Sequence, residues 1–311
     1  MAFLGRQRVL ITGRFGFTGR HLTQFLEHRG WEVFGLDPNE DANPEASPTI
    51  DILDTESVIH RLTEVRPTHI VHLAAHSHVV GDPLAFFRVN VLGTESLMEA
   101  IISSGIQPAK ILIASSANVY GNADQSPITE DSPLRPMNHY ALSKASMEQM
   151  LFKWCARLPI VITRPFNYTG PGQSEAFVMP KIVHAFHRRD IVIRLGNLDV
   201  ARDLSDIRFV CEAYHRLLQA QGTGQTFNIC SGSSIQLLRV LELLREISGH
   251  EPRIDVDPAF VRKDEIKELC GSPRRLFEVV GEIPVFSHLD ILDQMYRSIG
   301  HAAAPMSPTG S

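Results

Sequence analysis

The sequence lacks the features of several large classes of protein. Of its 311 residues, 30 are Lys or Arg and 35 are Asp or Glu, so the net charge is −5 and the pI is about 6.3. Without a basic excess, nucleic acid or an anionic membrane is not expected as the main partner. No apolar run reaches the roughly 18 residues that cross a bilayer. An anionic ligand would therefore need a local basic pocket rather than a basic surface.

Cysteine is scarce, and an export signal is not evident. The 4 cysteines, Cys155, Cys211, Cys230 and Cys270, lie 56, 19 and 40 residues apart and form no CxxC pair. This spacing fits neither a zinc site nor a disulfide framework, so reduced and buried thiols without a metal are expected. The N-terminus passes from MAFLGRQ into RVLIT without the apolar region of a signal peptide. These features predict a cytoplasmic protein.

The sequence does contain a repeated alternation of β-rich and helical patterns. RVLIT (8–12), EVFGLD (32–37), HIVHLA (69–74), KILIAS (110–115) and IVITRP (160–165) are short and almost wholly apolar. Such runs are typical of buried parallel strands. Helical patterns lie between them and end near glycines. The alternation predicts a doubly wound parallel α/β sheet, the Rossmann fold, in a dinucleotide-binding domain over residues 1–166.

After residue 166 this pattern loosens. Helical patterns recur at 177–188, 206–220 and 235–248, with a short strand at 227–230. We expect residues 167–300 to form a smaller α/β substrate-binding lobe over the carboxyl ends of the strands, with 200–232 packing back on the first domain. Residues 301–311, HAAAPMSPTGS, have the composition of a disordered tail.

A glycine-rich turn follows the first predicted strand. Gly13, Gly16 and Gly19 have the spacing G-x-x-G-x-x-G, which lets the chain turn tightly, approach a pyrophosphate and open a helix with free N–H groups. The second strand ends in Asp37, 18 residues beyond Gly19. A carboxylate there can accept both hydrogen bonds of an adenosine ribose and repel a 2′-phosphate. The pattern predicts a cofactor site for NAD or NADP in which Asp37 favours NAD, while the Arg14 guanidinium partly offsets that repulsion.

Other residues are assigned to the same site from their positions. Asp51 is placed to reach the adenine amino group, and Leu73–Ala75 provide room for the cofactor backbone. For these two assignments, packing at strand ends is an equally good explanation. The predicted cofactor-binding residues are Gly13, Arg14, Phe15, Gly16, Phe17, Asp37, Asp51, Ile52, Leu73, Ala74, Ala75, Tyr140, Lys144 and Pro165.

A tyrosine, a lysine and a serine form a candidate catalytic set. Tyr140 and Lys144 are spaced i and i+4, so they share one face of a helix. A nearby ammonium and an oxidised nicotinamide lower the pKa of a tyrosine and stabilise its phenolate, which makes it a usable acid–base. Ser116 ends a strand 24 residues upstream, where its hydroxyl can bind a substrate carbonyl oxygen. The set predicts hydride transfer at a carbinol or carbonyl carbon.

The motifs TGRFGFTG, HLAAHSHV, SSANVYG, YALSK and RPFN occur in this order and resemble the extended short-chain dehydrogenase/reductase family of nucleotide-sugar enzymes. The resemblance runs from residue 8 to about 295. It implies a Ser116, Tyr140 and Lys144 triad, a nucleotide-diphosphate sugar substrate, and a homodimer formed through helices at about 139–156 and 88–103. Met147, Met150, Leu151 and Trp154 form an apolar stripe on the first helix, which can serve the core, the interface or both.

The second half resembles the branch of this family that acts on GDP-sugars. The matching segments are RPFNYTGPGQSEAFV (164–178), LGNLDVARDLSDIR (195–208), FNICSG (227–232) and RKDEI (262–266). Arginines suit a diphosphate, and a glutamate can accept from a ribose diol or guanine. Surface or interlobe ion pairs are the alternative for each arginine. The resemblance implies substrate contacts from Asn167, Arg202, Arg262 and Glu265. From their positions, His76, Ser77, Asn118 and Val178 are also assigned to the substrate site, and for His76 a solvated or core-edge role is an equally good explanation.

The residue at position 118, an asparagine here, distinguishes between the reactions that this family catalyses. The related 4,6-dehydratases carry a carboxylate at this position as the base, and an amide cannot replace it. The resemblance therefore implies an NAD(P)H-dependent reductase of a nucleotide-linked 4-keto-6-deoxyhexose, with GDP-4-keto-6-deoxymannose giving GDP-rhamnose or its C4 epimer. Because Asp37 favours NAD, a 4-epimerase with tightly bound NAD is the alternative. A catalytically inactive NAD(P)-sensing regulator is a remote one, since the triad is intact.

Overall fold

The computed structural model describes residues 7–37, 49–76, 82–261 and 266–300. Its largest sheet has six strands, all parallel, in the order β2-β1-β3-β4-β5-β9. These strands are β1 (Arg8–Thr12), β2 (Glu32–Leu36), β3 (His69–His72), β4 (Lys110–Ala114), β5 (Ile160–Pro165) and β9 (Thr226–Ile229). The first five lie within the five apolar runs, so the doubly wound α/β fold predicted from the sequence is confirmed.

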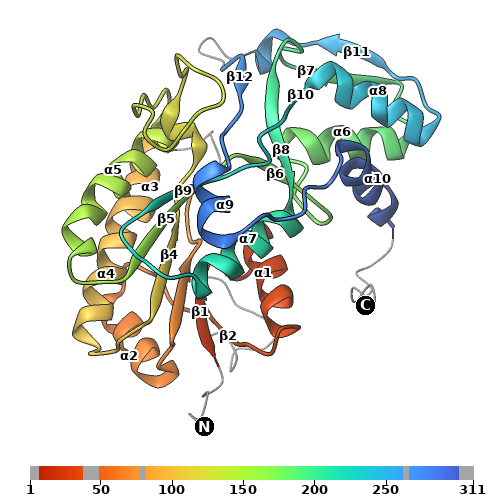
Figure 1. Cartoon of the computed structure of the whole chain (residues 1–311). Helices are drawn as coiled ribbons and strands as arrows, with labels where there is room; N and C mark the ends of the chain where they lie inside the picture. Colours follow the sequence, from red (N-terminus) through yellow and green to blue (C-terminus); the bar gives the residue numbers. More distant parts are fainter. Residues whose placement is uncertain (1–6, 38–48, 77–81, 262–265, 301–311) are drawn as a thin grey trace.

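Helices cover both faces of this sheet (Figure 1). Successive strand residues point to opposite faces, so Leu10 and Ile70 pack in one core cluster and Val9 and Val71 in another. The helices that pack in the cluster of Leu10 and Ile70 are α2 (Thr55–Val65), α4 (Gly93–Ser103) and α5 (His139–Cys155). The helices that pack in the cluster of Val9 and Val71 are α1 (Phe17–Glu27), α7 (Ile207–Gln219) and α9 (Arg274–Val280).

The strand order reverses beside β1, which pairs with β2 on one side and β3 on the other. In open α/β sheets, ligands bind in the crevice outside the carboxyl ends of the strands at such a point. The glycine turn at Gly13 follows β1, and the segment from Leu73 follows β3. The topology therefore brings two predicted cofactor segments to the same edge of the sheet.

The second half of the chain adds a smaller α/β lobe beside this edge (Figure 1). Its core is a separate cluster that includes Ile182, Leu204 and Leu244. The lobe contains β6 (Asn167–Thr169), β7 (Val192–Leu195), β8 (Ala201–Asp206), β10 (Ser234–Gln236), β11 (Arg253–Val256) and β12 (Glu268–Leu269), with α6 (Val178–Arg188), α8 (Leu237–Ser248) and α10 (His288–Ser298).

Two elements of the second half return to the large sheet. The predicted strand at 227–230 corresponds to β9, which pairs with β5 as an edge strand. Helix α7 packs in the same cluster as α1. The domain boundaries at residues 166 and 300 stay predictions, and the predicted tail 301–311 lies outside the described residues.

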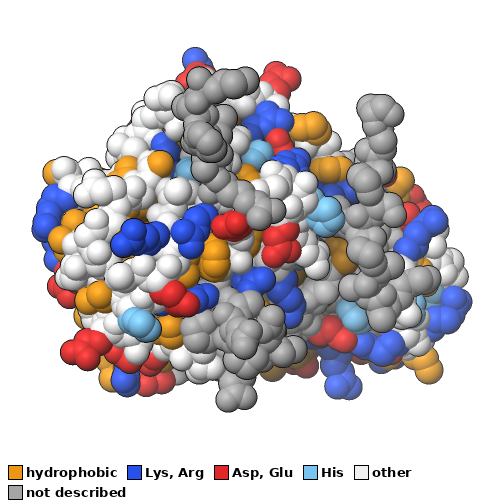
Figure 2. Space-filling model, turned by 90° about the horizontal axis from the view of Figure 1, so that it is seen from below, with side chains coloured by type: hydrophobic (Ala, Val, Ile, Leu, Met, Phe, Trp, Pro, Cys, Tyr) orange, Lys and Arg blue, Asp and Glu red, His pale blue; other side chains and the backbone are white. Residues whose placement is uncertain are grey.

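The surface carries charges of both signs. Figure 2 shows Lys and Arg side chains interspersed with Asp and Glu over the face seen from below. Within the described ranges, no helix has the length and apolarity needed to span a bilayer, and no group of three or more His, Cys, Asp or Glu is arranged to hold a metal. The 4 cysteines are unpaired, and Cys211, Cys230 and Cys270 are buried.

Candidate active site

The glycine turn after β1 is packed too closely for side chains. Gly13 has a φ of +73°, and a Cβ on it would lie 2.9 Å from the backbone nitrogen of Ala74. A Cβ on Gly19 would lie 2.2 Å from the carbonyl oxygen of Gly13. Gly16 occupies the N-cap of α1, so the free N–H groups of the first helical turn follow directly. This turn fits a pyrophosphate held at the helix N-terminus.

Asp37 and Arg14 lie side by side next to this turn. Asp37 is only 3% exposed, and its Oδ2 accepts a hydrogen bond from the Arg14 backbone N–H at 3.1 Å. The Arg14 Nη2 lies 3.7 Å from Glu27, whereas its buried Nη1 has no hydrogen-bond partner among the described residues. A fixed carboxylate suits a ribose diol, and an unsatisfied guanidinium nitrogen suits a phosphate. The residues present fit a nicotinamide dinucleotide.

The other predicted cofactor residues lie on the same elements or beside them. Phe15 is half-buried under the Arg14 guanidinium, and Phe17 stacks on Tyr168 of β6 with ring centres 6.2 Å apart. Ile52 is buried against Gly93 of α4. The exposed Asp51 uses Oδ1 to accept from the Leu53 N–H at 3.0 Å. The other predicted cofactor residues outside the catalytic set lie at strand ends. Leu73, Ala74 and Ala75 follow β3 and are half-buried, and Pro165 ends β5 and is buried.

The candidate catalytic residues come from the end of β4 and the first turns of α5. Ser116 caps the 3-10 helix η2 (Ala117–Tyr120), and its Oγ accepts from the Asn118 N–H at 3.2 Å. Asn138 caps α5 by accepting from the Ala141 N–H at 2.8 Å, which begins the helix just before Tyr140. Lys144 is 2% exposed, and its Nζ donates to the Ala114 carbonyl at 2.7 Å. The fold thus gathers all three side chains.

Burial shifts the acidity of this set. It raises the pKa of Tyr140 to about 12, and a hydrogen bond with Ser116 acts in the opposite direction. Burial lowers the pKa of Lys144 to about 8, which the negative charge of Glu148 partly offsets. Near neutral pH, Tyr140 is therefore a protonated phenol and Lys144 remains largely cationic. A protonated phenol beside an ammonium is arranged to give a proton to a developing alkoxide.

The predicted substrate residues are placed on both lobes. The His76 ring lies edge-on to Phe86 of α3 (Pro83–Phe87) at 5.0 Å, and the Phe86 ring also lies 6.2 Å from the Tyr140 ring, so Phe86 contacts both. Half-buried Asn118 lies in η2 two residues beyond Ser116. The other described members are exposed Asn167 on β6, exposed Val178 at the start of α6, and Arg202 on β8. Ser77, Arg262 and Glu265 lie outside the described residues.

Arg202 and Asn167 lie on neighbouring strands of the smaller lobe. Asn167 pairs with Leu204, two residues along β8 from Arg202. The Arg202 Nη1 donates to the carbonyls of Ala201 at 2.8 Å and Lys267 at 3.3 Å. These bonds orient the guanidinium on β8.

Sequence reasoning missed several buried polar residues beside the site. His72, at the end of β3, is 1% exposed, and burial lowers its pKa to about 3, with the Lys144 charge adding to the effect. Arg164, in β5, binds both carboxylate oxygens of Glu148 on α5. Asn90 is completely buried. For His72 and Arg164, the signal in the sequence was a polar residue within an otherwise apolar strand, in HIVH and in VITRP.

Comparison with known proteins agrees with this geometry. The fold and the site define an NAD(P)-dependent oxidoreductase of the extended short-chain dehydrogenase/reductase class that acts on nucleotide sugars. Within that class, the chain belongs to the family described as GDP-mannose 4,6 dehydratase, whose model matches residues 10–295.

Two characterised relatives and a solved structure are similar over nearly the whole chain. GDP-6-deoxy-D-talose 4-dehydrogenase of Aggregatibacter actinomycetemcomitans is 36% identical over 294 residues, covering 94% of this chain and 97% of that protein. GDP-6-deoxy-D-mannose reductase of Pseudomonas aeruginosa is 32% identical over 292 residues, covering 89% and 92%. The structure of RMD from Pseudomonas aeruginosa complexed with NADPH superposes with a TM-score of 0.82 at 29% identity, covering 94% of this chain and 98% of that one.

Proposed function

We propose that this protein reduces the 4-keto group of a GDP-linked 4-keto-6-deoxyhexose, converting GDP-4-keto-6-deoxymannose into GDP-rhamnose or its C4 epimer. The observation that carries the proposal is Asn118, an amide two residues beyond Ser116. Dehydration needs a base at this position to remove the C5 proton, and an amide is not a base. The two characterised relatives are named for a reductase and a 4-dehydrogenase of GDP-6-deoxyhexoses, which supports the same choice.

In the proposed reaction, Ser116 and Tyr140 act on the carbonyl oxygen at C4. The bound reduced nicotinamide supplies the hydride to C4. The Ser116 hydroxyl donates a hydrogen bond to the oxygen as negative charge develops, and Tyr140 transfers its proton to it, which completes the alcohol. Lys144 stabilises the phenolate that remains until a proton from solvent restores it. Asn118 does not take part in the proton transfer, and we assign its amide to a hydrogen bond with the sugar.

Binding of the nucleotide sugar is assigned to both lobes. We place His76, Ser77 and Asn118 at the hexose, and Asn167, Val178, Arg202, Arg262 and Glu265 at the nucleotide. Guanidinium groups bind diphosphates through paired, charge-assisted hydrogen bonds. Because the overall charge is −5, such local cations are what an anionic substrate requires.

The cofactor preference depends on Asp37 and Arg14. The fixed Asp37 carboxylate supports NADH, whereas Arg14 Nη1, which has no hydrogen-bond partner among the described residues, provides a donor for a 2′-phosphate. The similar structure from Pseudomonas aeruginosa contains NADPH. Asp37 also keeps a second candidate open, a 4-epimerase that retains tightly bound NAD and releases no oxidised cofactor.

We also propose that the enzyme is a cytoplasmic homodimer. Met147, Leu151 and Trp154 of the predicted stripe are buried in the core of their own chain. The free face instead presents Phe152 at 60% exposure on α5 and Leu92 at 58% just before α4. Paired helices from two copies would cover these side chains. The unpaired thiols suit a reducing compartment.

The test combines purified protein, GDP-4-keto-6-deoxymannose and NADH or NADPH. We expect loss of the reduced nicotinamide absorbance in proportion to the alcohol formed. The epimerase is tested with a GDP-hexose that carries a hydroxyl at C4: inversion at C4 without added or released cofactor would support the epimerase instead. The Tyr140→Phe variant is expected to lose about 100-fold to 10,000-fold in turnover, as is usual when a general acid is removed. Undiminished turnover in that variant would refute the catalytic assignment.

A further inference from the structure

Two segments that lie 150 residues apart in the sequence contact each other where the two lobes meet. The Thr18 hydroxyl on α1 and the Tyr168 hydroxyl on β6 form a hydrogen bond, with 2.7 Å between the two oxygens. The Phe17 ring, also on α1, stacks on the Tyr168 ring with an angle of 18° between their planes. One tyrosine thus joins a strand of the smaller lobe to the helix that follows the glycine turn.

The residues after β6 make further contacts with α1. His21 Nε2 lies 2.9 Å from the Pro171 carbonyl oxygen. Burial lowers the pKa of His21, so the ring is neutral near neutral pH, and it donates through its Nε2–H because a carbonyl only accepts. Arg20 Nη2 donates to the Gly172 carbonyl at 3.4 Å. Three hydrogen bonds therefore connect α1 to residues 168–172.

Gly170 shows how closely this segment is packed. A Cβ on Gly170 would lie 2.5 Å from the Ile207 Cγ2 atom at the start of α7 and 3.6 Å from the Phe17 Cζ atom. The segment therefore lies between α7 and α1 with no room for a side chain at this position. Since packed interiors transmit displacements rather than absorb them, a shift of α1 at this point must move the segment as well.

Both sides of this contact lead to an assigned ligand. On one side, Thr18 is the second residue of α1, after the Gly16 N-cap, in the turn whose free N–H groups fit the pyrophosphate. On the other side, Asn167 precedes Tyr168 on β6, and the segment leads to Val178 at the start of α6. Asn167 and Val178 are assigned to the nucleotide sugar. The contact thus connects the cofactor side of the site to the substrate side.

We propose that Tyr168 is a positioning residue through which binding of the dinucleotide and binding of the nucleotide sugar favour each other. A dinucleotide at the glycine turn fixes the first turn of α1, and the bond from Thr18 then fixes Tyr168 and β6. Because the smaller lobe has already lost part of its freedom, the nucleotide sugar binds at a lower cost in entropy. Such coupling is reciprocal and is typically about 5-fold to 150-fold in affinity. The part that concerns the sugar rests on the proposed function, and the part that concerns the cofactor does not.

The test compares Tyr168→Phe and Thr18→Val with Tyr296→Phe. The first variant removes only the hydroxyl and keeps the ring that stacks on Phe17. The second replaces the partner hydroxyl by a methyl group and keeps the branched shape of the side chain. Tyr296 is the matched control because it is also a half-buried tyrosine, on α10 of the smaller lobe, where its ring contacts His187.

Two quantities are measured for each protein, and neither requires turnover. The first is amide hydrogen exchange of residues 168–173, with and without a saturating amount of NADPH or NADH, whichever binds more tightly. The second is the dissociation constant of GDP, measured by calorimetry with and without the same cofactor.

In the wild-type protein, we expect the cofactor to slow exchange of residues 168–173 and to tighten GDP binding, each by at least about fivefold. Tyr168→Phe and Thr18→Val should each reduce both effects to less than about twofold, whereas Tyr296→Phe should keep the wild-type values. The double variant should lose no more than either single variant, since both changes remove the same hydrogen bond. A lowered melting temperature with unchanged coupling in both Tyr168→Phe and Thr18→Val would overturn the proposal.

The two measurements also separate this inference from the proposed function. If the wild-type protein neither binds GDP nor reduces the keto-sugar, the proposed function fails, while exchange with the cofactor alone still tests the contact of Tyr168 with α1. Wild-type exchange at residues 168–173 that stays the same when the cofactor binds would overturn the inference even in an active reductase. A GDP affinity that does not depend on the cofactor would overturn it as well.

Discussion

At the scale of single residues, Lys144 shows the cost of placing a cation in this site. Its ammonium is 2% exposed, and burial lowers its pKa to about 8. Because the folded-state pKa lies below the ordinary lysine pKa of 10.5, the unfolded chain binds more protons between these two pH values. The free energy of unfolding therefore rises with pH across this window. Below it, the charged lysine destabilises the cofactor-free fold.

The expected consequence is that Lys144→Met stabilises the cofactor-free protein while removing activity. At about pH 7 the free energy of unfolding should rise by about 1 to 3 kcal/mol, since the lost hydrogen bond to Ala114 offsets part of the gain. Urea unfolding at about pH 7 and at about pH 10 checks this, and the gain should shrink at the higher pH. Lys153→Met, whose side chain is 58% exposed, is the control. A destabilised Lys144→Met protein at neutral pH would contradict the interpretation.

Single residues also mark the limit of what the sequence could predict at the site. Ser116, Tyr140 and Lys144 belong to local motifs, so spacing alone was enough to propose them. Asn90 and Thr94 carry no such motif, because their partners are 14 and 22 residues away in the chain. Arg14 was noted for its charge, but the burial of its Nη1 without a hydrogen-bond partner in the described part of the chain depends on tertiary packing.

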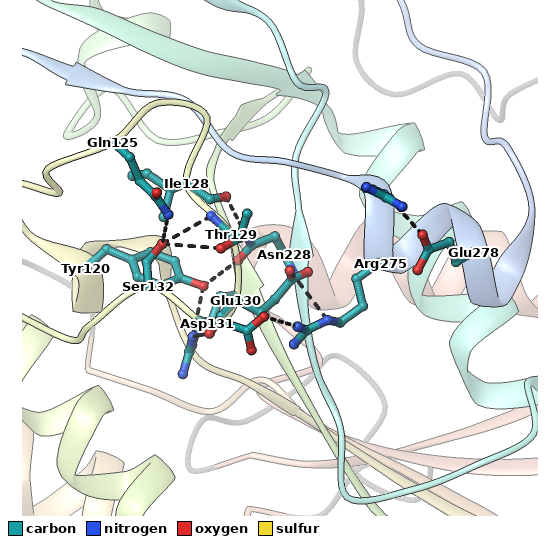
Figure 3. Close-up of polar contacts among 12 residues, drawn as sticks. Tyr120, Gln125, Ile128, Thr129, Glu130, Asp131, Ser132, Asn228, Arg275 and Glu278 are labelled. Atoms are coloured by element: carbon teal, nitrogen blue, oxygen red, sulfur yellow. Dashed lines mark hydrogen bonds and ion pairs between the residues drawn. The ribbon is translucent and has the colours of Figure 1, made fainter.

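At the scale of elements, a buried ion pair attaches the catalytic helix to the sheet. Glu148 of α5 is 2% exposed and Arg164 of β5 is 8% exposed, and the Arg164 Nη2 lies 2.5 Å from a Glu148 oxygen. Arg164 Nη1 also donates to the Tyr120 hydroxyl and to the Glu130 carbonyl. Figure 3 shows Tyr120, Glu130 and Asn228 within one polar network. The network ties α5 and β5 to β9.

Breaking this pair from one side should be costly. Glu148→Gln leaves the Arg164 charge buried without its counter-ion, so we expect the free energy of unfolding to fall by about 3 to 5 kcal/mol. Urea unfolding of Glu148→Gln, Arg164→Met and the double variant measures the coupling. The double variant should be more stable than the sum of the single effects by at least about 1 kcal/mol. Additive effects would show that the pair contributes no interaction energy.

The elements themselves were predictable to different degrees. The five strands of 1–166 were found because each reads as a short apolar run, the pattern of strands in a parallel sheet. The strand β8 (ARDLSD) was missed because its sequence is polar. Its Asp203 is buried because the carboxylate accepts hydrogen bonds from the Ser231 and Gly232 N–H groups, which an apolar pattern cannot predict. The pairing of β9 with β5 links residues more than sixty positions apart, which periodicity cannot reveal.

At the scale of the whole molecule, the proposed dimer predicts a specific surface. Lys153 bonds Glu95 and so joins α5 to α4, beside the exposed Phe152 and Leu92. Phe152→Glu should place a charge in the interface and convert the dimer to a monomer, as measured by sedimentation velocity. Leu238→Glu on α8, 48% exposed, is the matched control and should stay dimeric. A Phe152→Glu protein that remains a dimer would exclude this face.

In the proposed reaction, hydride moves from the reduced cofactor to C4 of the sugar. The most direct measurement uses GDP-4-keto-6-deoxymannose and a reduced cofactor that carries deuterium in the hydride it transfers. We expect a GDP-6-deoxyhexose with one deuterium bonded to C4, detected by proton NMR and mass spectrometry, and one oxidised cofactor for each product molecule. Recovery of the unreduced keto-sugar, or of a product without deuterium at C4, while the labelled cofactor stays reduced would contradict it.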